Sequence, residues 1–400
     1  MPLVNPYKNV DFGSDYKIQS MHHDHHIDLR FQEHYDRGFR HFAYSEYNRV
    51  LPNDPASFPE DYYGAAPPHP ETRWADNIPE DALFTPNSEH VGFGVATTPN
   101  GTPHISSMGS FAATIGNNGQ KFNDNPGLFI WDVANDQPIG FTEEEFYNYV
   151  YNGISDPNSE GTIGGMKFPD VGGLILLHPT SIERMERYLP LDEFIGTEIY
   201  NDRRDGSDEK MPNSTRGYLI HFWDKYLAAG NYCPAFVAAD RGRRGCNILL
   251  TKNYAEYDCL KAYSEATTYG RTSWDDDTLE FTRIEADDQK IIVETNNAEV
   301  IRIIADEKVV ATSTNNYLEY SLPHIPNGQV DHTYVRVEAR TGEFLDEGQS
   351  DREWPIPHYD DGLRYSNEIY SQPIMYRDKQ MVDALKSRVR NRKNFAAGII

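Results

Sequence analysis

Residues 22–26 read His-His-Asp-His-His and directly follow a strand-like segment. Imidazole nitrogens are common ligands of transition metals, and residues two apart on a strand share one face. The run therefore predicts a metal site, with two alternative registers. A literal His-x-His pair is His23 and His25, whereas the phase of the preceding strand selects His22 and Asp24. Because the run lies inside a strand-helix unit and not at a terminus, an added affinity tag is a poor explanation.

Further polar residues of the right chemistry lie at or after the ends of predicted strands. Two of them come directly after the apolar runs GGLILL and PAFVAA. In parallel α/β folds the loops converge at this end of the sheet, and sites are built there. We therefore expect a site at the strand ends that carry Glu46, His178 and Asp240. Glu89 of a predicted loop, and His104 fifteen residues later, are candidates to join it.

Strand-like and helix-like segments alternate through the first two-thirds of the chain. Apolar runs predict buried strands at 172–177 and 235–239, and helices are predicted at 217–229 and 254–266. This alternation indicates βα units in a parallel sheet or barrel. Residues 51–86 are rich in Pro, Asp and Glu and are predicted to form a long surface loop.

The pattern changes near residue 277 to short strands separated by turn residues, which is typical of a β-sandwich. We therefore divide the chain into an α/β unit at 1–275, a sandwich at 276–377 and a basic helix at 378–400. The helix is interpreted as solvated or docked on its own protein, with a partner protein as the alternative.

Composition narrows the class of protein. The 37 Lys and Arg residues against 62 Asp and Glu give a net charge of −25, which argues against a protein that coats nucleic acid. No apolar run is long enough to cross a membrane. Cys233, Cys246 and Cys259 form no C-x-x-C pair and fit reduced thiols. Since residues 1–15 show no secretory signal, we expect a cytoplasmic protein.

In their order along the chain, these residues resemble the motifs of the PHP (polymerase and histidinol phosphatase) superfamily of metal-dependent phosphoesterases. The early His-x-His motif is matched by the histidine run at 22–26, and the Thr-Asp-His that ends the second strand is matched by Ser45-Glu46-Tyr47. Glu89 resembles the glutamate of the third motif.

The second half of the motif set follows in the same order. HISSMG, which begins at His104, resembles the next motif, and LILLHP places His178 where a strand ends in His-Pro. Asp240-Arg241-Gly242 resembles the late Asp-x-His motif. The phrases GTEIYN and FWDKYLAAG are similar to the cehA-like branch, which often carries a C-terminal β-sandwich. The resemblance thus covers most of the chain.

The resemblance implies a distorted (β/α)7 barrel followed by the sandwich, and a site with one to three Mn, Fe or Zn ions. It implies hydrolysis of a small phosphate ester, in which a metal-activated hydroxide attacks phosphorus. Glu89, His178 and Asp240 would be the catalytic residues, and Glu89 is also a candidate to bridge two ions. The implied metal ligands are His22, His23, His25, Glu46, Glu89, His104, His178 and Asp240.

An anionic substrate of an acidic protein needs local cations. Arg241, Arg243 and Arg244 follow Asp240 directly and are candidates for a phosphate clamp, with a solvated basic turn as the alternative. The net negative charge repels polyanions, so a small phosphorylated molecule is the expected substrate.

Two positions depart from the motifs. Tyr47 and Gly242 stand where the family has histidines, which removes two imidazole ligands. The alternative hypothesis is therefore a PHP-like barrel without turnover that acts as a metal-binding, ligand-binding or interaction protein.

Overall fold

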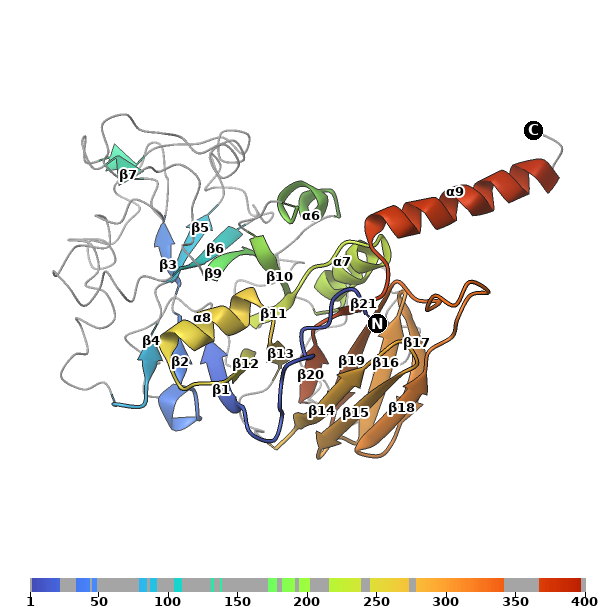
Figure 1. Ribbon diagram of the computed structural model, residues 1–400. Coiled ribbons are helices and arrows are strands. Elements are labelled where there is room, and N and C mark those ends of the chain that lie inside the picture. Colours follow the sequence, from blue (N-terminus) through green and yellow to red (C-terminus); the bar gives the residue numbers. More distant parts are fainter. Residues whose placement is uncertain are drawn as a thin grey trace, which may run out of the picture.

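The computed structural model describes residues 2–21, 34–43, 45–48, 79–84, 87–91, 104–109, 131–132, 137–138, 172–177, 182–190, 194–201, 216–238, 245–272, 278–341 and 367–396. These residues form a mixed α/β structure that is rich in strands (Figure 1). Its helices are α6 (Ile182–Tyr188), α7 (Arg216–Ala228), α8 (Glu256–Ser264) and α9 (Lys379–Ala396).

The larger sheet has ten strands and runs from the first part of the chain into the predicted sandwich. Its order is β17-β16-β19-β20-β13-β12-β1-β2-β4, with β21 also paired to β19. The strands are β17 (Lys308–Ser313), β16 (Val300–Ala305), β19 (Tyr334–Arg340), β20 (Glu368–Ser371), β13 (Thr268–Arg271), β12 (Cys246–Thr251), β1 (Tyr16–Met21), β2 (His41–Phe42), β4 (Leu83–Phe84) and β21 (Ile374–Met375).

A second sheet has six strands in the order β11-β10-β9-β6-β5-β3. The chain passes from β2 to β3 and from β4 to β5, so two of its strands continue from one sheet into the other. The strands are β11 (Ala235–Ala238), β10 (Phe194–Asn201), β9 (Gly172–Leu177), β6 (His104–Gly109), β5 (Asn87–Val91) and β3 (Ser45–Asn48). A separate short pair is formed by β7 (Trp131–Asp132) and β8 (Gln137–Pro138).

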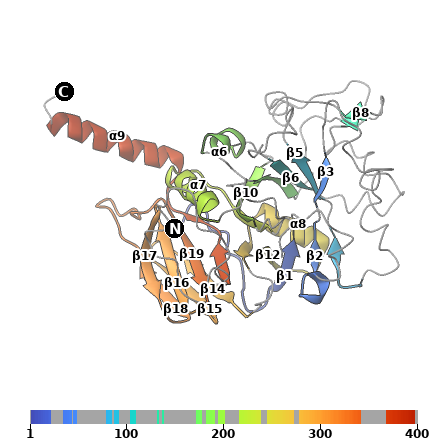
Figure 2. The same cartoon turned by 180° about the vertical axis from the view of Figure 1, so that it is seen from behind.

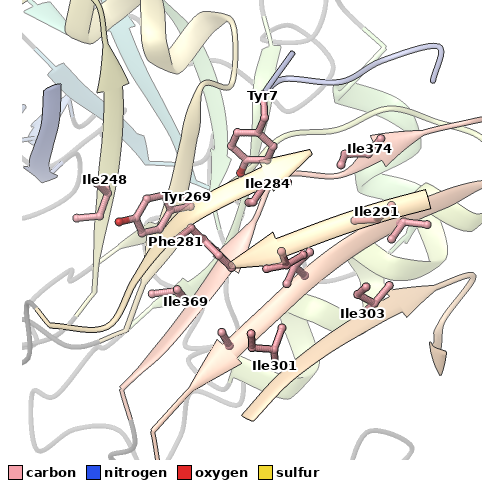
Figure 3. Packing of buried hydrophobic residues seen from close by; sticks show 14 of the residues in the cluster. Tyr7, Ile248, Tyr269, Phe281, Ile284, Ile291, Ile301, Ile303, Ile369 and Ile374 are labelled. Atoms are coloured by element: carbon pink, nitrogen blue, oxygen red, sulfur yellow. The ribbon is translucent and has the colours of Figure 1, made fainter. Parts of the chain in front are cut away.

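The sandwich is formed by a three-stranded sheet that faces part of the ten-stranded sheet (Figure 1). The three strands are β14 (Glu280–Ala286), β15 (Lys290–Asn296) and β18 (Tyr317–Ser321). Sandwich residues such as Phe281 and Ile301 share one buried cluster with Ile248 and Tyr269 of the first part of the chain (Figure 3). The rings of Tyr269 and Phe281 meet edge to face at 5.2 Å. Both sheet and core thus continue across residue 276.

The two large sheets share another core around α8. Ile18 and Leu249 of the ten-stranded sheet and Ile175 and Phe236 of the six-stranded sheet belong to one buried cluster. Its remaining members are Ala43 and the α8 residues Cys259, Leu260, Ala262 and Tyr263. This core fixes the distance between the sheets and therefore positions the strand ends described below.

Two sequence expectations need correction. The sequence predicts β12 in a parallel sheet, but β12 runs antiparallel to β1. The physical reason is its connection to the preceding strand β11, which consists of residues 239–244 alone. A parallel crossover needs a dozen or more residues. Within the expected surface loop at 51–86, residues 83–84 form β4, which pairs in parallel with β2. Because the described strands lie in two hydrogen-bonded sheets, a closed (β/α)7 barrel stays a prediction.

A buried ion cluster joins α7 to the sandwich. Asp224 of α7 accepts hydrogen bonds from Arg336 Nε and Nη2 at 2.7 and 2.8 Å and from the Tyr334 hydroxyl at 2.8 Å. Arg336 Nη1 also donates to Glu338 at 2.6 Å, and its guanidinium lies 5.1 Å from the Trp223 ring. The cluster fixes α7 against β19.

The basic segment near the end of the sequence forms α9. Both views show α9 extending away from the sheets, with its first turn next to the sandwich and α7 (Figure 1 and Figure 2). Val382 in that turn is buried, whereas Asp383, Lys386 and Ser387 are exposed. Among the described residues, no helix combines the length and apolar character needed to cross a membrane.

Candidate metal centre

Five strands of the six-stranded sheet point the same way, so their carboxyl ends lie along one side of the sheet, which we call the common edge. β3 pairs in parallel with β5, and β9, β10 and β11 pair in parallel with one another. Because β6 runs antiparallel to both β5 and β9, those two strands point the same way. The last residues at this edge are Asn48, Val91, Leu177, Asn201 and Ala238.

The end of β1 lies beside the end of β11. A Cβ added at Gly245 would lie 2.5 Å from the carbonyl oxygen of Ala238, and the Asn247 side chain hydrogen-bonds to Val237. β11 therefore runs antiparallel to β12 and parallel to β1. Since β1 pairs with β12 up to Asn247, it ends at Met21 next to this junction, directly before the histidine run.

Two predicted ligands share one face of the six-stranded sheet. Glu89 pairs with Tyr47 on one side and with Ser106 on the other, and His104 pairs with Val91. Because paired residues share a face and alternate residues return to it, Glu89 and His104 are diagonal neighbours on that face. Diagonal neighbours of this kind lie about 7 to 8 Å apart.

Glu46 lies on the opposite face. It precedes Tyr47 on β3 and pairs with Ser88, so strand alternation separates it from Glu89. The Glu89 face is also the face of Ile175, which packs in the α8 core between the sheets. The structure thus brings Tyr47, not Glu46, beside Glu89, and ligation by Glu46 stays a prediction.

The other predicted site residues lie outside the described residues. For these, the structure places only the strand ends that precede them in the chain, at Met21, Leu177 and Ala238. No group of three or more His, Cys, Asp or Glu that would suit a metal ion occurs among the described residues. The residues concerned are His22, His23, His25, His178, Asp240, Arg241, Arg243 and Arg244.

A buried polar network lies under the ends of β1 and β2. The Ser20 hydroxyl lies 2.6 Å from His41 Nδ1 and 2.7 Å from the Tyr263 hydroxyl. Asn247 Nδ2 donates to the same Tyr263 hydroxyl at 3.5 Å. All four side chains are fully buried. The network connects β1, β2, β12 and α8 at the candidate site.

One hydrogen bond fixes the orientation of the Asn247 side chain. The Val237 N–H donates to Asn247 Oδ1, so the Asn247 NH₂ group faces the Tyr263 hydroxyl. The Ser20 hydroxyl lies between this phenol and His41 Nδ1 and can hydrogen-bond to both.

The stability of the fold should decrease with acid because of His41. Burial lowers the pKa of His41 from 6.5 to about 3. Below pH 6.5 the unfolded chain takes up a proton that the folded chain refuses until about pH 3. The free energy of unfolding should therefore fall by about 1.4 kcal/mol for each pH unit in this window. Urea unfolding of the wild type and His41→Asn from neutral pH to about pH 5 measures how steeply the free energy of unfolding depends on pH. Equal slopes in the two proteins would contradict the lowered pKa of His41.

Gly245→Ala should destabilise the junction of β11 and β12. Gly245 has a φ of +97°, and its added Cβ would meet the Ala238 carbonyl at 2.5 Å. We expect a loss of about 2 to 3 kcal/mol from the left-handed backbone and the collision together. Gly328→Ala is the matched control, because Gly328 has a φ of +83° with nothing within 4 Å. Chemical denaturation should show the larger loss for Gly245, and equal losses would show that the contact is unimportant.

Sequence reasoning did not identify the buried network. Ser20 lies on the same face of β1 as Ile18, and His41 precedes Phe42 and Ala43 in an otherwise buried strand segment. A polar residue at a position where the strand pattern expects an apolar one was the available signal. Partners from three other elements are not visible in a single segment.

The three cysteines offer no alternative metal site. Cys233, Cys246 and Cys259 are free and buried, as expected for reduced thiols. Burial raises the pKa of each thiol, most strongly for Cys233 and Cys259. Thiols in this state are protonated and poor ligands.

Comparison with known proteins gives a distant structural likeness. No family model matches the chain, and no curated protein matches it. The chain is similar to the crystal structure of a two-domain protein from Bacteroides vulgatus that contains a predicted PHP-like metal-dependent phosphoesterase. The identity is 11% and the TM-score 0.38, over 86% of this chain and 94% of that chain.

Proposed function

We propose that the chain is a metal-dependent phosphoesterase of the PHP type that hydrolyses a small phosphate ester. The observation that carries the proposal is the common edge of the strands. β9 and β11 end there directly before the segments with His178 and Asp240, and β1 ends beside β11, directly before the histidine run. Glu89 and His104 lie on strands that reach the same edge. Motif residues far apart in the sequence thus belong to neighbouring strand ends.

The donor set suits a divalent metal ion. Glu89 and His104 occupy diagonal positions on one face of the sheet, so the proposed site combines a carboxylate residue with an imidazole residue. Mixed oxygen and nitrogen donors suit Mn, Fe and Zn. When bound, such an ion supplies Lewis-acid stabilisation of phosphate oxygens and a water with a lowered pKa.

Particular roles follow for the protein's own residues. Glu89 and His104 would hold the ion, with His22, His23, His25, His178 and Asp240 as further ligands. Arg241, Arg243 and Arg244 would bind the substrate phosphate, which the overall charge of −25 would otherwise repel. The site would select a small phosphate ester over a polyanion.

The distorted barrel is part of this proposal. β2 and β4 continue into β3 and β5, which joins the two sheets at one side. At the other side, the Asn247 side chain joins β11 to β12. These two junctions support a closed arrangement of the strands around the α8 core.

Tyr47 supports a second candidate function, a metal-binding or ligand-binding protein without turnover. Tyr47 lies directly across from Glu89, on the face of the predicted ligands, where the family motif has a histidine. A neutral phenol is a weaker metal ligand than an imidazole. Reduced metal occupancy would leave binding without efficient hydrolysis.

Metal analysis tests the proposal first. Protein purified without an affinity tag should hold at least about one equivalent of Mn, Fe or Zn, measured by inductively coupled plasma mass spectrometry, because the mixed donor set suits these ions. Loaded protein should hydrolyse a mono- or diester in a phosphatase panel, and chelation should remove the activity. Less than one equivalent would exclude the enzyme, while full metal content without turnover would favour the second candidate. His178→Ala should abolish hydrolysis, and unchanged activity would show that the site is misplaced.

A further inference from the structure

Two side-chain amides occupy the edge of β11 that faces away from β10. The N–H of Ala235 donates to Gln372 Oε1 at 2.8 Å, and Gln372 Nε2 donates to the Ala235 carbonyl at 2.7 Å. Asn247 repeats this arrangement at Val237, with both bonds at 2.9 Å. Among the described strands, β11 forms backbone pairs with β10 alone. Each amide therefore replaces one pair of hydrogen bonds of a neighbouring strand. We call these two-bond arrangements the Gln372 clamp and the Asn247 clamp.

The two clamps differ in what they hold together. Gln372 lies at the first residue of β11 and also donates to Thr268 Oγ1 at 2.8 Å, so it links β11 to the start of β13. Asn247 lies near the last residue of β11, and its backbone partner on β1 is Ser20. Only the Asn247 clamp therefore connects the two strand ends from which the chain continues to the histidine run and to Asp240.

The close approach at this junction leaves few alternatives to Asn247. A Cβ added at Gly245 would lie 2.5 Å from the Ala238 carbonyl oxygen, so β12 approaches β11 closely at the end of the strand. The amide fills the remaining gap with one donor and one acceptor, and its NH₂ group also reaches Tyr263. An apolar side chain of the same size would leave the buried N–H and C=O of Val237 without these bonds.

We propose that Asn247 is a positioning residue of the metal site, which holds the ends of β1 and β11 at the spacing that the metal requires. The inference rests on the proposed function. Gln372 stabilises the same strand by the same chemistry at the opposite end and has no such role. Outer groups that orient metal ligands typically change metal affinity by about 10- to 100-fold when they are removed.

The test compares Asn247→Leu with Gln372→Leu in the full-length protein. Each substitution removes one two-bond clamp from β11, and urea unfolding measures the stability loss of each variant. Isothermal titration of metal-free protein with Mn²⁺ should show affinity weakened about 10- to 100-fold for Asn247→Leu. Gln372→Leu should bind Mn²⁺ with an affinity within about twofold of the wild type, since its clamp lies at the other end of the strand.

The outcomes separate this inference from the proposed function. If the wild type does not bind Mn²⁺, the proposed function fails and the inference fails with it. If the wild type binds and the two variants are weakened equally, or Asn247→Leu binds normally, the inference alone is wrong. Should Asn247→Leu not fold, Asn247→Ser and Gln372→Ser provide the same comparison. In Asn247→Ser, amide exchange of Val237 should accelerate relative to Ala235, and unchanged exchange would contradict the clamp.

Discussion

Asp224→Ala should lower the free energy of unfolding by about 3 to 5 kcal/mol. Asp224 accepts two hydrogen bonds from Arg336 and one from Tyr334, and all three residues are buried. Among the described residues, its removal leaves the Arg336 guanidinium paired with the Glu338 carboxylate, at 2.6 Å. The cost arises because the positive charge of Arg336 stays buried after one of its two carboxylate partners has been removed. Urea unfolding followed by circular dichroism measures the change.

An exposed ion pair in the same region provides the control for Asp224. Arg377 donates to Asp331 at 2.9 Å, but the Asp331 side chain is 51% exposed. Asp331→Asn should therefore cost less than about 1 kcal/mol. If Asp224→Ala lowered the free energy of unfolding as little as Asp331→Asn, burial would not govern the strength of these ion pairs. In that case α7 would be fixed by apolar packing alone.

His104→Ala should reduce phosphoesterase activity by about a thousandfold, which corresponds to about 4 kcal/mol of transition-state stabilisation. His104 begins β6 at the common edge and is the diagonal neighbour of Glu89, so its loss removes an imidazole from the proposed metal site. The same variant should show reduced Mn²⁺ content. Steady-state kinetics on the best substrate of the panel, with metal analysis of the same sample, measures both effects.

His324→Ala is the matched control for His104. His324 is exposed and pairs with Val330 in the sandwich, far along the chain from the candidate site. Its removal should change neither activity nor metal content. Full activity in His104→Ala would show that the register of β6 does not place a ligand, and Glu89→Gln would then test whether any residue of this face takes part.

The local elements were largely predictable from sequence. The apolar run at 172–177 forms β9 with the predicted bounds, and the short strands predicted after residue 277 include β17 and β18. Such segments have strong apolar or alternating patterns between turn residues, and their neighbours in sequence are their neighbours in space.

The arrangement of strands was less predictable. Two short strands that lie close together in the sequence, β2 and β3, belong to different sheets, and no local pattern separates them. Pairing between β13 and β20 joins residues about a hundred positions apart, and no local pattern encodes it. The antiparallel direction of β12 was accessible, because the link at 239–244 is too short for a crossover.

The candidate site divides in the same way. The resemblance to the family motifs suggested Glu89 and His104 together, and the pairing of β5 with β6 makes them neighbours on one face. The resemblance also suggested Glu46, which alternation along β3 places on the other face. Asn247, the positioning residue that we propose, belongs to no motif, because its contacts join separate elements.

Because the ten-stranded sheet is continuous, the sandwich cannot be removed or exchanged as an independent domain. Excision after residue 276 would strip β20 from β13 and remove Gln372 from Ala235, which leaves two buried strand edges open to water. Open edges of this kind recruit other chains and aggregate. Gene fusion or shuffling at this boundary would thus yield insoluble halves, and the two parts are constrained to evolve together.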